Sequence, residues 1–141
     1  MVQATPAAAG EEVLLGLWRV IRRLKASAAA LGGDPAALHV VHMVKEHGPL
    51  RLTALAEAAM LDASTVSRHV QHLEAAGHLA RTTDPADRRA TLIEVSESGR
   101  ALLREALAAR GRLLDDALAG WPAEDRAALA RLLSRLAEDM A

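Results

Sequence analysis

The segment of residues 53–96 constrains the fold of this chain more than any other. It contains two short stretches with helical spacing of apolar residues, 53–59 and 63–76, separated by a turn at residues 60–62. Two stretches with strand character follow, 79–83 and 91–95, and a charged hairpin joins them. This order predicts a helix-turn-helix followed by a β-hairpin wing.

Capping residues mark where the two helices begin and end. Thr53 is expected to cap the first helix, and Asp62 is expected to cap the second by accepting from the amide of Thr65. Gly77 follows the second helix, where a left-handed residue ends a helix and redirects the chain. The entry and exit of the second helix are therefore specified locally.

The second helix has one apolar face and one polar face. At about 100° per residue, Val66, Val70 and Leu73 lie together and the polar residues lie opposite. Arg can bond guanine, Gln can bond adenine, and Ser or Thr can reach phosphate or base edges in the major groove. The candidate DNA contacts on this helix are Ser64, Thr65, Ser67, Arg68, Gln71 and His72. The alternative is an ordinary solvated helix face.

The hairpin between the two strands carries adjacent guanidinium groups at Arg88 and Arg89. An Arg at a hairpin tip can enter a minor groove, where narrow A·T-rich segments concentrate negative potential. Asp87 precedes Arg89 by two residues, so its carboxylate is expected to brace that guanidinium by charge-assisted hydrogen bonds. The alternative is a solvated ion pair in a loop, which contributes little to stability.

Five runs in this order resemble the multiple-antibiotic-resistance regulator (MarR) family. They are LTALAE at 52–57, STVSR at 64–68, LEAAG at 73–77, DPADRR at 84–89 and VSESG at 95–99. The resemblance implies a dimeric winged-helix transcription regulator that binds pseudo-palindromic DNA. Members usually act as repressors that a small ligand or oxidation releases.

The expected fold is mostly α with a small β-hairpin wing (α+β). Residues 1–10 are predicted to be a flexible tail and 11–141 a single domain, with the winged helix-turn-helix at 34–96 and dimerisation helices at 11–31 and 97–140. The terminal helices carry more Leu, Val and Ile than one small core can cover. A homodimer in which these stripes are buried together is therefore expected.

The resemblance also implies an effector cleft between the dimerisation helices and the winged domain, which places Trp18, His39 and His42 within reach. A flat aromatic or phenolic molecule can stack on Trp18 and pair with His. The alternative is that these residues serve packing and solvation. His39, His42 and Glu46 share one helix face, where they are competent zinc ligands. His and Glu on a helix face are more often simply solvated than bound to a metal, so no metal site is predicted.

Charge and composition narrow the function classes. The formal net charge is −1, and residues 48–95 hold five Arg against six acids. DNA affinity then depends on local placement of a few cations, and the salt dependence of binding is expected to be modest. With no Cys, a disulfide framework and cysteine-based redox sensing are excluded.

The sequence lacks the features that would indicate export, membrane insertion or catalysis. The first ten residues lack signal-peptide features, and no run approaches the ~20 apolar residues of a membrane span. A cytoplasmic protein without a membrane partner is expected. No cofactor-binding loop or catalytic constellation is present, so an enzyme is not predicted. The competing function is a winged-helix module that binds protein instead of DNA.

Overall fold

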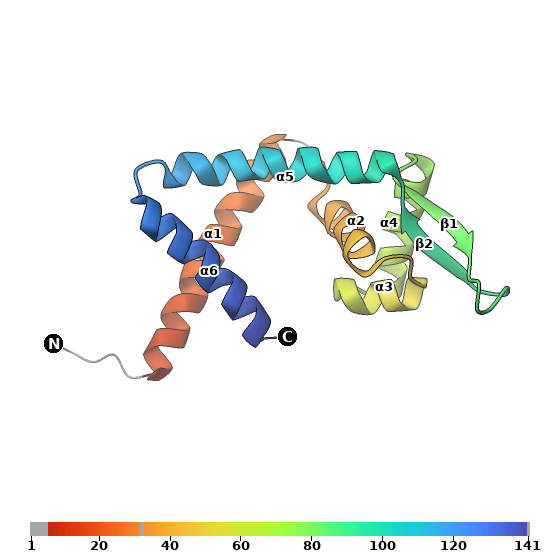
Figure 1. Cartoon of the computed structure of the whole chain (residues 1–141), viewed down its shortest axis with the longest axis horizontal. Helices are drawn as coiled ribbons and strands as arrows, with labels where there is room; N and C mark the ends of the chain where they lie inside the picture. Colours follow the sequence, from red (N-terminus) through yellow and green to blue (C-terminus); the bar gives the residue numbers. More distant parts are fainter. Residues whose placement is uncertain (1–5, 32, 141) are drawn as a thin grey trace.

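The computed structural model describes residues 6–31 and 33–140 and confirms the predicted fold class (Figure 1). These described residues form six helices and one antiparallel hairpin. Their bounds are α1 (Pro6–Leu31), α2 (Pro35–His47), α3 (Leu52–Ala59), α4 (Ala63–Ala75), β1 (Leu79–Thr83), β2 (Thr91–Val95), α5 (Glu97–Leu118) and α6 (Ala123–Asp139). Both strands have the predicted bounds.

One hydrophobic core holds α2, α3, α4, the hairpin and the first part of α5 together. β-Branched residues from α2 and α4 fill much of its centre, because the apolar stripes of both helices face inward. The largest fully buried side chains are Val40, Val41, Val44, Leu55, Val66, Val70 and Ile93. This body fixes α4 relative to the wing.

The wing is an antiparallel ladder that is also attached to the loop before α3. Leu79 pairs with Val95, and Thr83 pairs with Thr91 at the far end. Leu50 and Ile93 exchange two backbone hydrogen bonds, of 3.1 Å and 2.9 Å. A two-stranded hairpin is marginally stable alone, so this bridge anchors the wing to the helical body.

Helix boundaries differ from the predictions at two N-termini. Helix α1 begins at Pro6, so residues 6–10 are helical where a tail was expected; residues 1–5 lie outside the described residues. Arg51, not Thr53, occupies the N-cap position of α3, and no side-chain cap bond forms there. The predicted Thr53 cap is therefore wrong, since Thr53 is already the second residue of the helix.

Helix α5 connects the winged body to an arm formed by α1 and α6 (Figure 1). Helix α1 packs on α5, whereas α6 contains no buried residue. Large apolar side chains of α1, α5, α6 and the turns that follow α5 and α6 are exposed in the single chain, namely Val13, Leu14, Leu15, Trp18, Val20, Ile21, Leu107, Leu114, Trp121, Leu132, Leu133 and Met140. Among the described residues, no helix is long and apolar enough to cross a bilayer.

Candidate nucleic-acid interface and effector cleft

The start of α4 is fixed by Asp62, as the sequence predicted. Its carboxylate accepts from the Thr65 amide at 2.9 Å, the Thr65 hydroxyl at 2.6 Å and the Ser64 hydroxyl. The Ser64 hydroxyl and the Thr65 donors lower the pKa of Asp62, so it is a carboxylate at neutral pH. Both hydroxyl protons are thereby engaged. Ser64 and Thr65 must release Asp62 before they can donate to a phosphate.

The end of α4 confirms the predicted role of Gly77. Its φ of 79° is left-handed, and its amide donates to the Glu74 carbonyl at 2.9 Å. The His78 amide donates to the Leu73 carbonyl at 2.8 Å, which completes a Schellman motif. The chain therefore turns directly from α4 into β1.

The outward face of α4 presents Arg68, Gln71 and His72 to solvent, with Ser67 half-buried beside them. Within the described ranges, no intramolecular hydrogen bond or ion pair engages the side chains of these three exposed residues. His69 is different: its Nδ1 lies 3.4 Å from Oδ2 of Asp34 on the body side. The free donors of α4 therefore gather on one exposed surface.

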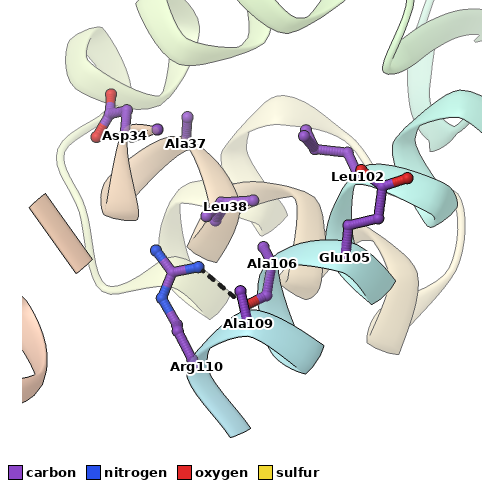
Figure 2. Close-up of a pocket in the computed structure, with 9 residues that line it drawn as sticks. Asp34, Ala37, Leu38, Leu102, Glu105, Ala106, Ala109 and Arg110 are labelled. Atoms are coloured by element: carbon purple, nitrogen blue, oxygen red, sulfur yellow. Dashed lines mark hydrogen bonds between the residues drawn. The ribbon is translucent and has the colours of Figure 1, made fainter. Parts of the chain in front are cut away.

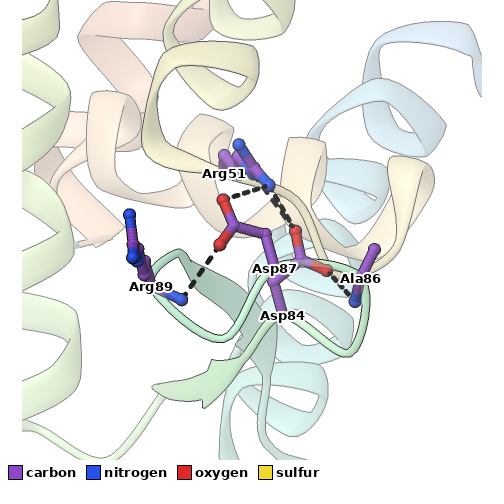
Figure 3. Close-up of polar contacts among 5 residues, drawn as sticks. All are labelled: Arg51, Asp84, Ala86, Asp87 and Arg89. Atoms are coloured by element: carbon purple, nitrogen blue, oxygen red, sulfur yellow. Dashed lines mark hydrogen bonds and ion pairs between the residues drawn. The ribbon is translucent and has the colours of Figure 1, made fainter.

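The wing tip is built around Asp84, the buried charged residue among those described (Figure 3). Nε and Nη2 of Arg51 donate to Oδ2 of Asp84 at 3.2 Å and 2.7 Å. Oδ1 of Asp84 accepts from the Ala86 amide at 2.9 Å. These bonds, those of Arg51 first, lower the pKa of Asp84, and the carboxylate in turn raises the pKa of Arg51.

Asp87 does not brace the Arg89 guanidinium, so that prediction is wrong. Its Oδ1 accepts from the backbone amide of Arg89 at 3.1 Å, and its Oδ2 lies 3.6 Å from Nη2 of Arg51 (Figure 3). The guanidinium groups of Arg88 and Arg89 are exposed, and no ion pair holds either within the described chain. The wing therefore presents two unpaired cations. Arg81, in contrast, is paired with Glu74 at 2.7 Å.

A second concave region lies between α2 and α5 (Figure 2). Two adjoining cavities, of about 410 Å³ and about 200 Å³, share Leu38, Ala106 and Arg110 in their walls. His39 and His42 line the smaller cavity. Trp18 lines neither and is 60% exposed on α1. Two of the three predicted effector residues are therefore brought together, and Trp18 is not.

Two buried nitrogen atoms at this cavity have no partner among the described residues, Nη2 of Arg110 and Nδ1 of His42. Nη1 of Arg110 donates to the Ala106 carbonyl at 3.2 Å, and Nε2 of His42 lies 3.4 Å from Glu46. His39 instead donates from Nε2 to the Ala59 carbonyl at 3.1 Å. His39 is therefore directed away from the His42–Glu46 pair, and the described residues contain no group of three or more potential metal ligands.

The sequence reasoning missed Arg51, Asp84 and Arg110. Arg51 and Asp84 are 33 residues apart, so no local pattern joins them. One signal was present: a non-capping residue stands directly before α3, at the position where a cap was needed. Arg110 falls on a helix face that becomes a cavity wall only when α2 packs on α5.

Comparisons with known proteins agree with this architecture. The MarR family model matches residues 34–91. YxaD of Bacillus subtilis, an uncharacterized HTH-type transcriptional regulator, is 32% identical over 97 residues, which cover 69% of this chain and 68% of YxaD.

Solved structures extend the likeness to the whole fold. A MarR family protein from Bacillus stearothermophilus has a TM-score of 0.82 at 23% identity, covering 97% of this chain and 99% of that one. BpsR of Bordetella bronchiseptica, whose DNA binding is regulated by 6-hydroxynicotinic acid, has a TM-score of 0.59 at 25% identity, covering 84% and 91%. With its helix-turn-helix, its wing and these relatives, the chain belongs to the MarR family of transcriptional regulators.

Proposed function

We propose that the protein binds pseudo-palindromic operator DNA as a homodimer and represses adjacent genes. The observation that carries this is the exposed face of α4 beside a wing with two unpaired guanidinium groups. Such a helix suits the major groove, and such a wing suits the neighbouring minor groove. A dimer bound across a promoter excludes polymerase from the same DNA, which gives repression.

The DNA test uses duplexes tiled across the region upstream of the protein's own gene. Fluorescence anisotropy at low salt should find one fragment that binds more tightly than a scrambled duplex of equal composition. The slope of log affinity against log salt should be modest, because residues 48–95 carry no net positive charge. Failure of every fragment at low salt would favour the alternative, a winged-helix module that binds another protein.

The homodimer is supported by the apolar surface of the arm. Leu132 and Leu133 on α6 are 54% and 44% exposed, and Val13 on α1 is 51% exposed. Exposed apolar surface gathered on two helices is unusual for a monomer and typical of an interface. Pairing two arms about a two-fold axis would set the recognition helices about 34 Å apart, one turn of DNA. Sedimentation at micromolar concentration should give a dimer, and a monomer would contradict the proposal.

The effector is proposed to be a small aromatic acid in the cavity between α2 and α5. A guanidinium nitrogen without a partner is costly to bury, and a carboxylate is the group that satisfies it best. Nη2 of Arg110 offers such a donor on a wall with apolar members such as Leu103 and Leu107. Nδ1 of His42, which donates or accepts according to the ring tautomer, is a second polar atom there without a partner among the described residues. That combination suits a planar ring with a carboxylate or a phenolic oxygen. BpsR, with its 6-hydroxynicotinic acid, is consistent with this class.

A ligand in this cavity would act on DNA binding by changing how α5 lies against α2. The ligand weakens the DNA complex only if it has a higher affinity for the dimer conformation that does not bind DNA than for the one that does. Trp18 lies outside the cavity of one protomer, so a fluorescence change that is assigned to Trp18, and not to Trp121, would report a ligand that also reaches α1.

The effector test is calorimetric titration with 6-hydroxynicotinate and salicylate. Binding should be lost in Arg110→Met and retained in Arg112→Met, a matched change on an exposed residue of α5. The bound acid should also weaken the DNA complex of the unaltered protein. Equal affinity in the two variants would remove Arg110 from the site. No heat and no effect on DNA at millimolar acid would defeat the effector proposal.

A further inference from the structure

We propose that Arg51 is a positioning residue for DNA binding, which orients the wing so that Arg88 and Arg89 meet the minor groove. This rests on the proposed DNA-binding function. Arg51 stands at the N-cap position of α3, yet it forms no cap there. Its guanidinium instead reaches the loop at the wing tip and donates twice to Asp84 (Figure 3).

The bond ties the part of the wing that the β-ladder leaves free. The ladder ends at the Thr83–Thr91 pair, and residues 85–89 beyond it are all exposed. The neighbouring bridge between Leu50 and Ile93 holds the middle of β2, four residues after Arg89 in the sequence. Backbone hydrogen bonds close the tip within itself, from the Asp84 amide to the Ala90 carbonyl at 3.0 Å and from the Ala90 amide to the Asp87 carbonyl at 2.9 Å. Asp84 joins this closed tip to the body, because its carboxylate accepts from Arg51 as well as from the Ala86 amide.

Arg51 also compensates the negative charge at the tip. Asp84 and Asp87 lie beside the two wing arginines, and both carboxylates are within 4 Å of the Arg51 guanidinium. Without Arg51, these carboxylates would face the DNA phosphates uncompensated and would attract the wing arginines to themselves. Arg51 therefore leaves Arg88 and Arg89 available for DNA.

The geometry requires arginine and not simply a positive charge. Nε and Nη2 bond one carboxylate while Nη2 also approaches the second, which uses the planar fork of the guanidinium. A lysine would retain the charge and lose this fork. Arg51→Lys therefore separates positioning from charge compensation.

The experiment is a double-mutant cycle on affinity for the tightest operator duplex, with Arg51→Lys and Arg89→Ala. Arg51→Lys should weaken binding about 3- to 10-fold in the unaltered background, because an unfastened tip must be ordered on binding. It should change affinity less than about 2-fold in the Arg89→Ala background, where the wing contact is already lost. Arg104→Lys, which alters an exposed ion pair with Glu97 on α5, is the control and should have no effect.

Hydrogen exchange provides a second readout that does not need DNA. Arg51→Lys should speed exchange of the Ala86 and Arg89 amides and leave the amides of α3 and α4 unchanged. Equal losses of affinity in both backgrounds, or unchanged exchange at the tip, would overturn the positioning role. If the unaltered protein bound no DNA, the proposed function would fail, and unchanged tip exchange would then separately refute the tie between Arg51 and the wing.

Discussion

Gly99 in the first turn of α5 lies directly against the carbonyl group of His78, at the junction of α4 and β1. A Cβ atom on Gly99 would overlap that carbonyl oxygen and would lie 2.9 Å from Cγ2 of Val95. Ser96 reinforces the junction, because its amide donates to His78 and its hydroxyl donates to Gly77 at 2.6 Å. The start of α5 is thus fastened to the turn that ends the recognition helix.

Gly99→Ala should therefore destabilise the protein, although Ala is normally the better helix former. The new methyl group must displace backbone, so a loss of about 1–3 kcal/mol in the free energy of unfolding is expected. Gly111→Ala is the matched control, since a Cβ there meets nothing within 4 Å of the same chain. It should stabilise α5 by about 0.5–1 kcal/mol. Urea unfolding followed by circular dichroism measures both, and equal effects would contradict the close approach at Gly99.

The parts of the fold that the sequence predicted well are those with short-range causes. Asp62 bonds the hydroxyl and amide of Thr65 three residues later, and Gly77 needs only its own φ of 79°. The strands were bounded correctly because turn residues flank both. Local chemistry was sufficient in each case.

The parts that could not be predicted depend on partners far away in the sequence. The sequence predicts a pair between Asp87 and Arg89 because the two residues are close in the chain. In the structure, Oδ2 of Asp87 instead lies 3.6 Å from Arg51, which belongs to the loop before α3. Arg110 became a candidate only when α2 covered its side of α5. The early start of α1 has a different cause: Pro6 suits the first position of a helix and three Ala follow it, so the helix forms there and continues through Gly10.

Charged substitutions in the arm should dissociate the proposed homodimer. Leu132→Glu places a carboxylate in an apolar interface without a partner, which should weaken association by about 3 kcal/mol, or roughly 100-fold. Met60→Glu is the control, because Met60 is an equally apolar residue that is 89% exposed at the turn before α4, outside the arm. Sedimentation equilibrium should show monomers for the first variant and dimers for the second. Two unaffected dimers would place the interface elsewhere.

Acid should loosen the wing and the start of α4 before other parts of the body. Asp62 and Asp84 both have a lowered pKa, because the Ser64 and Thr65 donors favour the charged form of Asp62 and the Arg51 guanidinium favours that of Asp84. Their stabilisation is therefore complete above the unfolded pKa of about 4 and is lost as the pH falls through the lowered folded pKa. Asp84→Asn should lower the melting temperature at pH 7 and flatten its fall below pH 4.

The control for the acid prediction is Asp115→Asn on α5, an exposed residue without an ion pair in the described chain. Melting curves of this variant and the unaltered protein should fall in parallel between pH 7 and pH 3. If the melting temperature of Asp84→Asn fell with pH in parallel with those of the control and the unaltered protein, the bond between Arg51 and Asp84 would not contribute to stability.

Arg68 and Arg89 should differ in what their loss does to DNA binding. Arg68 lies on the exposed face of α4, where a guanidinium can bond both acceptors of a guanine edge. Arg68→Ala should therefore cost about 1–3 kcal/mol of binding free energy and relax the preference at one symmetric pair of operator positions. Arg89 lies at the wing, where groove width matters more than base identity. Arg89→Ala should weaken binding to many sequences, most on operators with A·T-rich flanks, and should reduce the salt slope.

Asp87→Ala tests whether the Asp87 carboxylate supports the DNA contact of Arg89 or opposes it. Asp87 accepts from the Arg89 amide and approaches Arg51, so its removal should loosen the tip and partly reproduce the loss seen in Arg89→Ala. If Asp87 acted mainly by repelling phosphate, the same change would instead tighten binding. Anisotropy titrations of the three variants against the operator and a flank-substituted duplex, over a salt series, distinguish these outcomes, with circular dichroism confirming that each variant is folded. Undiminished affinity in both Arg variants would remove α4 and the wing from the DNA interface.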